Sequence, residues 1–511
     1  MDRADNLQDQ QSNDGFDHVP PAADALLESF RGMGYSPGAA IADLIDNSIA
    51  AGARRVRVEF IWRAGGSVVR IVDDGRGMTE AELVEAMRPG GRNPLARREA
   101  DDLGRFGLGL KTAALSQGRV LAVASRSSAE KDVVRSWDLD YVAGTREWRL
   151  LRAAPDDVNE CVAVPEGYPT GTTIVVGRLD RLVGDADNDA RLRFLAVAGA
   201  VERHLAMTFH RYLEGNRPQL ELHIGSGDTG RKIEPWDPFL QSHPATTSTP
   251  LERLPNSGGV EVQGFVLPHR DRMTAAEFET AAGPDGWLAH EGFFVYRNRR
   301  LLVAGGWLGL GPGRRWTRDD VHRLARIRLD LPNSVDEEWK VDIRKSAAVP
   351  PPAFRERLQR LADQVRKNAR EVFAWRGGIT TKRTTSSPLV SAWTAMESRR
   401  GSAYRIDRAH PAVERALEQS GGSRKAVEEM LTVLESTLPV QRIWLDVVEK
   451  GDLPVTSSEM PPDQKAVLRS LYAHMRTALG LSADAARARL LSVEPFSSYP
   501  ADISLLPDNP A

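Results

Sequence analysis

The sequence predicts an α+β protein of several domains, and three observations support this. The chain has 511 residues, which is enough for two to four domains. From residue 21 to about 375, strand-like alternation of apolar residues mixes with helical periodicity. Beyond a Gly/Ser/Thr-rich stretch, helical periodicity dominates. We therefore expect a disordered tail at 1–20, an α/β domain at 21–185, a second at 186–375, a linker at 376–388 and a mostly helical C-terminal region at 389–511.

The composition is that of an ordinary globular protein, with 41% hydrophobic and 27% charged residues. The single cysteine, Cys161, excludes an internal disulfide and a multi-cysteine metal site, and we expect it to be a buried apolar residue in a strand. The chain starts with acidic and polar residues and has no apolar run of 18 residues. We therefore expect a cytoplasmic protein with neither a signal peptide nor a membrane span. The net charge of −2 neither favours nor excludes nucleic-acid binding.

The first domain has clear start and stop signals for its helices. Ser36, Pro37 and Gly52 are the N-cap, first-turn and C-cap residues of one expected helix. Thr79 and Glu82 have the spacing of a capping box, which predicts the start of another helix. Strands are expected at 54–62, 66–75, 119–126 and 171–179, a further helix at 110–117, and a long glycine-rich loop, of a length typical of functional loops, at 88–109.

The second region has the pattern of another α/β domain. A long helix is expected at 351–375, with Leu358, Leu361, Val365 and Val372 on one apolar stripe. The other elements expected in this region are a helix at 193–213 and strands at 219–224, 260–267, 292–303 and 325–331.

Two short motifs in the first domain could carry chemistry. Asp43 and Asn47 lie one helical turn apart on one face, where a carboxylate and an amide can hold a water and a cation. Asp73 ends a strand and is followed by Gly75 and Gly77. That carboxylate can accept a hydrogen bond from an amine, and the glycines let a flat ligand approach the backbone. Taken alone, the first motif reads more simply as a surface pair and the second as an Asp-Gly turn.

Two further motifs follow along the chain. Gly104, Gly107 and Gly109 lead into a helix start, whose N–H groups and dipole attract phosphate. The segment fits neither the G-x-x-x-x-G-K-[ST] nor the G-x-G-x-x-G pattern. Lys111 either adds positive charge to such a site or is a solvated lysine on the helix. Thr172 lies at the head of a strand, directly after Gly171.

In this order and spacing, the four motifs resemble the sequence boxes of the GHKL ATPases (HATPase_c). This family includes gyrase B subunits, MutL, ninety-kilodalton heat-shock chaperones, histidine kinases and MORC proteins. The resemblance covers residues 21–180 and implies a Bergerat-fold α/β sandwich that binds ATP and Mg²⁺. The E-x-x-x-N box is matched by Asp43 and Asn47, D-x-G-x-G by Asp73, Gly75 and Gly77, G-x-x-G-x-G by Gly104, Gly107 and Gly109, and the Gly-Thr box by Gly171 and Thr172.

The resemblance assigns a role to each matched residue. It implies that Asn47 binds Mg²⁺ through its amide oxygen and that Asp73, supported by Thr172, holds the adenine amine. Asp43 stands where the family has a glutamate that orients or deprotonates the attacking water, and its shorter side chain implies slow turnover. The remaining contacts would be Gly75, Gly77 and Met78 near the base, and Gly104, Phe106, Gly107, Leu108, Gly109 and Lys111 around the phosphates, under a lid formed by 88–109.

The second region resembles the ribosomal-S5-domain-2-like transducer domain of MutL-type ATPases. Residues 337–351 are similar to the end of that domain, where a lysine reaches the γ-phosphate. Lys345 is the residue we assign to this role, with Lys340 and Arg344 as alternatives. Charges at a strand end are also commonly just solvated, so this reading stays open.

An arginine-rich segment, Arg297–Arg328, is a candidate DNA surface. Its nine arginines are opposed by only Asp319 and Asp320, and Trp307 and Trp316 lie among them. The alternative reading is a set of solvated strand faces. The nine are Arg297, Arg299, Arg300, Arg314, Arg315, Arg318, Arg323, Arg326 and Arg328.

The function expected from these features is ATP hydrolysis that drives lid closure and homodimerisation, making a nucleotide-gated clamp on DNA or a partner protein. The layout is similar to bacterial GHKL proteins that accompany restriction or phage-defence genes, with the helical C-terminal region as a partner surface. Two alternatives stay open: a non-hydrolysing ATP-dependent binding module, and a protein kinase of the histidine-kinase class. Against the kinase, we find no helix with a phosphoacceptor histidine ahead of the first domain.

Overall fold

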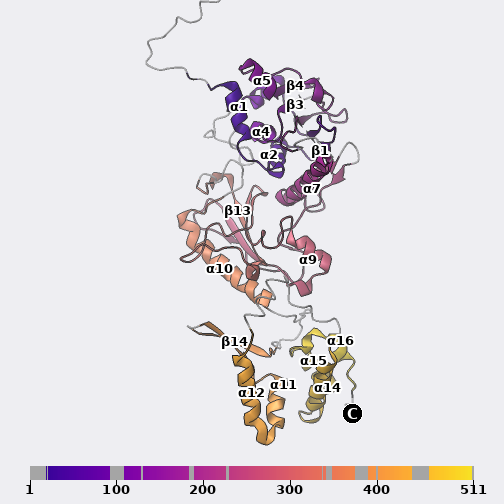
Figure 1. Ribbon diagram of the computed structural model, residues 1–511, viewed down its shortest axis with the longest axis vertical. Helices are drawn as coiled ribbons and strands as arrows, with labels where there is room; N and C mark the ends of the chain where they lie inside the picture. Colours follow the sequence, from indigo (N-terminus) through magenta and orange to yellow (C-terminus); the bar gives the residue numbers. More distant parts are fainter. Residues whose placement is uncertain are drawn as a thin grey trace, which may run out of the picture. The chain divides into compact units, whose positions relative to one another are not determined.

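The computed structural model describes residue 19 and residues 21–91, 109–127, 131–182, 189–225, 230–335, 338–340, 348–374, 390–398, 401–439 and 460–508. The chain divides into two compact units, Met1–Ala374 and Trp375–Ala511. The first unit contains two mixed sheets with separate cores, which we call the first and second domains (Figure 1). This architecture confirms the α+β class. Among the described residues, no helix has the length and apolar character needed to cross a membrane.

The first domain is built on a seven-stranded sheet in the order β4-β3-β5-β2-β1-β6-β7. Every pairing is antiparallel except that of β1 with β6. The strands are β1 (Arg55–Ile61), β2 (Val68–Asp73), β3 (Val120–Arg126), β4 (Val133–Asp138), β5 (Gly171–Gly177), β6 (Glu221–Gly225) and β7 (Arg231–Lys232). The helices are α1 (Ala23–Arg31), α2 (Pro37–Ala50), α3 (Glu80–Met87), α4 (Gly109–Leu115), α5 (Leu139–Thr145), α6 (Asp156–Asn159), α7 (Ala190–Thr208) and α8 (His210–Leu213).

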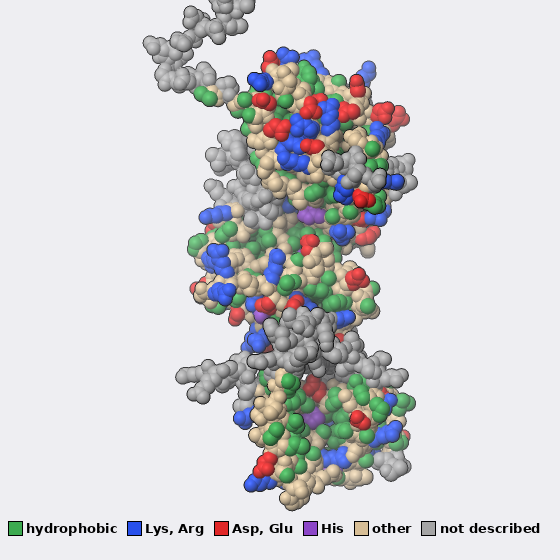
Figure 2. Space-filling model, in the orientation of Figure 1, with side chains coloured by type: hydrophobic (Ala, Val, Ile, Leu, Met, Phe, Trp, Pro, Cys, Tyr) green, Lys and Arg blue, Asp and Glu red, His purple; other side chains and the backbone are tan. Residues whose placement is uncertain are grey.

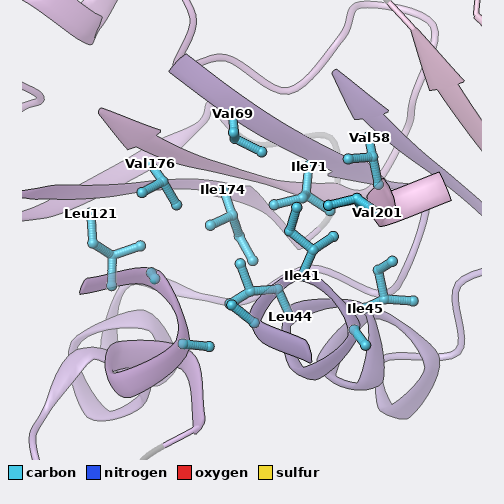
Figure 3. Packing of buried hydrophobic residues seen from close by; sticks show 14 of the residues in the cluster. Ile41, Leu44, Ile45, Val58, Val69, Ile71, Leu121, Ile174, Val176 and Val201 are labelled. Atoms are coloured by element: carbon cyan, nitrogen blue, oxygen red, sulfur yellow. The ribbon is translucent and has the colours of Figure 1, made fainter. Parts of the chain in front are cut away.

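Helix α2 packs its apolar side against the sheet. Ile41 and Leu44 point from the helix towards Ile71 and Ile174 of the strands, and Val201 of α7 extends the same core (Figure 3). Burial of such side chains is the main favourable term in folding. The predicted start signals are confirmed, because the side chain at the N-cap of α2 accepts a backbone hydrogen bond and α3 begins with a complete capping box. The core therefore fixes the position of α2 relative to β2.

The core of the first domain extends well past residue 185, where we expected a boundary. Phe194 and Leu205 of α7 and Leu222 of β6 are buried in it, and the same cluster reaches Ile233. Strand β6 pairs parallel with β1, in a register that aligns Val56 with Leu222. Helix 193–213 and strand 219–224, expected in the second domain, thus belong to the first. Local patterns do not reveal a parallel pairing between strands that are distant in sequence.

The opposite face of the first sheet has a smaller apolar cluster. Val120, Ala122 and Val175 of the sheet contact Val158 and Cys161 in this cluster. Cys161 is buried and has a free thiol, as expected, but it lies in a turn after α6 instead of in a strand.

The second domain has a six-stranded sheet with the path β12-β11-β13-β10-β8, and β9 pairs with β10. Helix α10 packs along β10 and β13, and Leu358 and Val365 of its predicted stripe are buried in the core (Figure 1). The strands are β8 (Thr247–Ser248), β9 (Glu252–Arg253), β10 (Glu261–Val266), β11 (Gly292–Arg297), β12 (Arg300–Ala304) and β13 (Ala325–Leu331). The helices are α9 (Ala275–Ala282) and α10 (Pro352–Ala374), with 3-10 turns η2 (Arg270–Arg272), η3 (Asp320–His322) and η4 (Asn333–Val335).

The second unit is mostly helical, with one β-hairpin. Its core is formed by Leu468, Leu471 and Tyr472 of α14 with Leu490 of α15 and Ile503 of α16. Its elements are β14 (Trp393–Ser398), β15 (Gly401–Ile406), α11 (Pro411–Gln419), η5 (Gly421–Ser423), α12 (Arg424–Ser436), α14 (Pro462–Thr477), α15 (Ala483–Leu490), η6 (Phe496–Ser498) and α16 (Pro500–Ser504).

Candidate functional site

Helix α2 and strand β2 meet where β2 ends. The Ser48 hydroxyl donates a hydrogen bond to Asp73 Oδ2 at 2.8 Å, and the Gly75 N–H donates to Asp73 Oδ1 at 3.0 Å. Asp73 is only 3% exposed. Burial raises the pKa of its carboxyl group, whereas the hydrogen bonds from Ser48 and Gly75 lower it. The motif that contains Asp43 and Asn47 and the motif that contains Asp73 therefore form one site.

Two strands, β5 and β3, place hydroxyl groups on the side of the sheet where Asp73 lies. The sheet register aligns Asp73 of β2 with Thr172 of β5, and Thr172 with Ser125 of β3. The Thr172 and Ser125 hydroxyl oxygens are 3.0 Å apart, and the Met78 N–H donates to Ser125 Oγ at 2.8 Å. Thr172 and Met78 thus lie at the site where we expected them. Ser125 was missed because its strand has no motif, and only the register of the sheet reveals its position.

The glycines of these motifs are required by the packing of the chain itself. Gly77 has φ +66°, and a Cβ there would lie 1.9 Å from the Arg126 carbonyl oxygen. A Cβ on Gly171 would lie 2.2 Å from the Asp73 carbonyl oxygen, and one on Gly75 would lie 2.9 Å from the Ala51 Cβ. Side chains cannot be accommodated at these distances. We had expected the glycines to admit a flat ligand, but the neighbouring backbone already requires them.

Asn47 and Asp43 lie in different environments despite their spacing. Asn47 is exposed, and its Nδ2 donates to the Asp43 carbonyl oxygen at 3.3 Å. The Asp43 side chain is only 4% exposed. Because the hydrogen bond uses the amide nitrogen of Asn47, the amide oxygen is the atom suited to a cation. The described residues contain no cluster of three His, Cys, Asp or Glu side chains that could hold a metal. A single amide that shares Mg²⁺ with substrate phosphates fits this arrangement.

The Asp43 carboxylate belongs to a buried polar network. Tyr35 Oη donates to Asp43 Oδ2 at 3.0 Å, and Arg300 Nη2 donates to Asp43 Oδ1 at 3.1 Å. Arg300 Nε also donates to Asp46 Oδ2 at 2.8 Å. Burial, reinforced by the nearby Asp43 carboxylate, raises the pKa of Tyr35. Sequence reasoning did not single out Tyr35 or Asp46. A second acid three residues after Asp43 was the available signal, because two buried carboxylates need a cation.

Helix α4 begins at Gly109 and buries Lys111. Lys111 Nζ donates to the Ala86 carbonyl oxygen at 2.9 Å, and the side chain is only 2% exposed. Lys111 is therefore not a solvated lysine, and its role at a phosphate site stays a prediction. Of the expected lid, only residues 88–91 and Gly109 are described. The predictions for Gly104, Phe106, Gly107, Leu108, Arg344 and Lys345 lie outside the described residues.

The arginine-rich segment is not one continuous surface. Arg297, Arg300 and Arg326 are buried, and Arg323 and Arg328 are partly buried. The segment includes β12, β13 and the end of β11, and side chains on one face of these strands point into the interior of the protein. Our expectation of a nine-arginine DNA surface was therefore wrong for these five. The exposed arginines are Arg299, Arg314, Arg315 and Arg318.

The face of the first domain seen in Figure 2 carries interspersed acidic and basic side chains. Arg119 and Arg178 both pair with Asp140, and Arg178 also pairs with Asp157. Such mixed networks do not form a single-sign surface for a polyanion.

Comparison with known proteins agrees with the geometry. Residues 35–167 match the family model of the histidine kinase-, DNA gyrase B- and HSP90-like ATPases. The DNA mismatch repair protein MutL of Paramagnetospirillum magneticum is 29% identical over 198 residues, which are 39% of this chain and 28% of that protein. MutL of Xanthomonas axonopodis pv. citri is 27% identical over 246 residues, which are 47% of this chain and 36% of that protein.

The matched segments cover a limited part of these relatives. MutL of Azotobacter vinelandii, for example, is 27% identical over 208 residues, which are 38% of this chain but 29% of that protein. The chain thus spans about a third of the length of the curated relatives it matches. The matched family model ends before β5, so the pairing of Asp73 with Thr172 is an observation of the structure alone. Residues 35–167 of this chain are therefore similar to a GHKL ATPase domain, and part of the chain is similar to MutL.

Proposed function

We propose that the first domain binds Mg·ATP and hydrolyses it, and that the nucleotide gates a dimeric clamp on DNA or on a partner protein. One observation carries this proposal. The hydrogen bond from Ser48 to Asp73 joins the helix that contains Asp43 and Asn47 to the strand that contains the D-x-G-x-G motif. These motifs are distant in sequence, and GHKL chemistry needs them in one site. The family match over residues 35–167 supports the same reading.

In this proposal, different residues bind the adenine, the Mg²⁺ ion and the phosphates of the nucleotide. The Asp73 carboxylate, held by Ser48 and Gly75, accepts the adenine amine, and the paired hydroxyls of Thr172 and Ser125 complete that end of the site. The Asn47 amide oxygen binds Mg²⁺. Bound Mg²⁺ neutralises charge on the phosphates. Gly104, Phe106, Gly107, Leu108 and Gly109 would surround the phosphates, and Lys345 would reach the γ-phosphate.

Hydrolysis requires Asp43 to accept a proton from the attacking water. Both carboxylate oxygens of Asp43 accept hydrogen bonds, from Tyr35 and Arg300. Each oxygen keeps a further acceptor site for water, but the two bonds limit how far the carboxylate can turn towards a substrate. This fixed position favours a second candidate function, a non-hydrolysing module that only responds to bound ATP.

DNA is the partner we propose for the loop that precedes β13. The ring centroids of Trp316 and Trp307 are 5.6 Å apart, and the Arg366 guanidinium carbon lies 4.7 Å from the centroid of the Trp316 ring. The loop is therefore anchored. Its outward side chains include Arg314, Arg315 and Arg318, for which we find no ion pair within the described residues. The curated relatives are DNA mismatch repair proteins by name. Exposed guanidinium groups on a fixed loop suit phosphate contacts.

Protein partners are proposed for the second unit. Met430, Val433 and Leu434 of α12 are about half exposed and share one helical face. A role in a bacterial restriction or phage-defence system is part of the proposal by similarity of layout alone.

The experiment that tests the nucleotide site is equilibrium binding of a fluorescent ATP analogue, with and without Mg²⁺. We expect Asn47→Ala to lose the Mg²⁺-dependent part of the affinity, because the amide oxygen would be gone. Asn216→Ala is the matched control, since Asn216 is an exposed amide away from the site. Equal Mg²⁺ dependence in the wild type and Asn47→Ala would contradict the assignment of Asn47.

A further inference from the structure

The hairpin between β11 and β12 is one part of the second domain that contacts the first, beside the ion pair of Arg211 with Asp330. Tyr296 Oη lies 2.7 Å from His210 Nε2, and Tyr212 Oη donates to the Asn298 carbonyl oxygen at 2.5 Å. The Arg211 guanidinium lies 4.8 Å from the Tyr296 ring. The two domains are therefore joined through side chains of this hairpin, as well as through the covalent chain.

Arg300 of the second domain contacts Asp43, the proposed catalytic acid of the first domain. It is the first residue of β12, yet its guanidinium binds two carboxylates of α2, Asp43 at 3.1 Å and Asp46 at 2.8 Å. The side chains of Arg300, Asp43 and Asp46 are 5%, 4% and 2% exposed. Each acid is bound through a different nitrogen, Asp43 by Nη2 and Asp46 by Nε. The fork of the guanidinium thus fixes two groups at once, which a lysine ammonium cannot do with the same geometry.

The charge of Arg300 matters because the two carboxylates are close and buried. Removing one member of a buried ion pair leaves an uncompensated charge. Without Arg300, the two carboxylates would also lose the donor that they share. The Asp43 side chain would then no longer be held in one orientation, and a catalytic group acts only when it is correctly placed.

The other groups around this network do not replace the guanidinium. Tyr35 donates its hydroxyl to Asp43 and carries no positive charge. The ring of His204, on α7, lies against Gly38 of α2, and burial, with the charge of Arg300 nearby, lowers the pKa of His204 to about 4. His204 is therefore neutral at pH 7. Lys111, on α4, donates its ammonium to the Ala86 carbonyl oxygen.

We propose that Arg300 is a positioning residue through which the second domain holds the Asp43 carboxylate correctly oriented for hydrolysis. This inference rests on the proposed ATPase function and adds a role for the second domain in it. An undocked second domain would leave Asp43 and Asp46 without the guanidinium that they share. Competence for hydrolysis then depends on the docking of the β11–β12 hairpin.

The test compares steady-state ATP hydrolysis by the full chain and its variants over a range of ATP concentrations. Arg300→Gln keeps donor groups but removes the charge. We expect kcat to fall about tenfold or more with KM for ATP changed less than about threefold. Arg300→Lys, which keeps the charge, should recover part of kcat. Arg357→Gln is the control, because Arg357 forms an exposed pair with Glu252 in the same domain.

A second variant tests the shared guanidinium from the other acid. Asp46→Asn keeps an oxygen that can accept from Arg300 Nε, so Arg300 stays in place beside Asp43 and kcat should fall less than in Arg300→Gln. This variant keeps the proposal testable if Arg300→Gln folds poorly, because it is the milder change.

The possible results are distinct. A wild-type kcat in Arg300→Gln, or a fall in kcat that Arg300→Lys does not recover in part, would overturn the role of Arg300 while leaving ATP hydrolysis in place. No phosphate release by the wild type, with ATP still bound, would instead contradict the proposed hydrolysis itself, and this inference would fall with it. A higher kcat in Arg300→Gln would show that the contact inhibits Asp43, which contradicts the proposal.

Discussion

The buried carboxylate of Asp73 lowers the stability of the folded protein at neutral pH, and we propose a function for it in nucleotide binding. Its carboxyl group has a raised pKa, mainly because burial disfavours the charged form. The folded state therefore binds this proton more tightly than the unfolded state. The stability contributed by this group is present below the unfolded pKa and is lost as pH rises through the folded pKa. At neutral pH the buried carboxylate thus opposes folding, and we attribute its presence to recognition of the adenine amine.

We predict that Asp73→Asn leaves the free protein as stable as the wild type or more stable at pH 7, while ATP binding is lost. The amide can still accept from the Gly75 N–H and donate to the Ser48 hydroxyl, but it carries no charge. Chemical unfolding at pH 7 and pH 4, beside nucleotide titration, measures both effects, and the stability gain should shrink at the lower pH. Wild-type ATP affinity in this variant would exclude Asp73 as the adenine contact.

Gly77 offers a test of the packing that surrounds this carboxylate. A Cβ at Gly77 would meet the Arg126 carbonyl oxygen at 1.9 Å, and φ there is +66°. We expect Gly77→Ala to lower the free energy of unfolding by about 2–4 kcal/mol, from backbone displacement and strain together. Gly65→Ala is the matched control, because a Cβ at Gly65 has no atom within 4 Å among the described residues. Equal unfolding midpoints for the two variants would contradict the close approach.

At the scale of elements, the loop before β13 is where DNA binding is expected. Replacing Arg314, Arg315 and Arg318 together with Gln should weaken DNA binding and reduce the slope of log affinity against log salt by up to about 3. Fluorescence anisotropy with a labelled duplex at several salt concentrations measures both quantities.

The control for this prediction is a triple variant elsewhere on the second domain. Arg253, Arg357 and Arg360 are also exposed, and replacing them with Gln removes the same charge. If DNA affinity and its salt dependence fall equally in both triple variants, the loop is not a specific DNA contact. If the wild type binds no DNA at low salt, the loop arginines are simply solvated.

The elements themselves were largely predictable from local signals. The Ser36 cap and the Thr79–Glu82 capping box fixed the starts of α2 and α3, and apolar alternation located β1 to β3. Three of the four boxes lie on α2, β2 and β5, which the structure brings together, whereas the third box lies outside the described residues except for Gly109. Each of these signals lies within a few residues, which is why single-sequence reasoning could find them.

Tertiary pairings were not predictable in the same way. The parallel pairing of β6 with β1 joins distant segments, so α7 and β6 were assigned to the wrong domain. Arginine in a strand is usually exposed, and nothing near Arg300 in sequence shows that Asp43 and Asp46 face it. The position of Ser125 beside Thr172 likewise depends on the register of the sheet.

At the scale of the whole molecule, the proposed clamp predicts a change of oligomeric state. We expect the mass of the protein in solution, measured by light scattering after size-exclusion chromatography, to double when a non-hydrolysable ATP analogue and Mg²⁺ are added. Asn47→Ala should stay at the lower mass, because it should not bind Mg·ATP. A mass that is independent of nucleotide would contradict gating by dimerisation, without bearing on ATP binding itself.

The central claim is that the first domain hydrolyses ATP through Asp43. The most direct test is phosphate release from Mg·ATP, with and without DNA, by the wild type, Asp43→Asn and the Arg357→Gln control. We predict that the wild type and Arg357→Gln release phosphate at equal rates. We also predict that Asp43→Asn binds ATP but that its rate of phosphate release is at least about 100-fold lower. Undiminished release by Asp43→Asn would contradict the assignment of the base, and no release by a wild type that binds ATP would leave a nucleotide-responsive binding module.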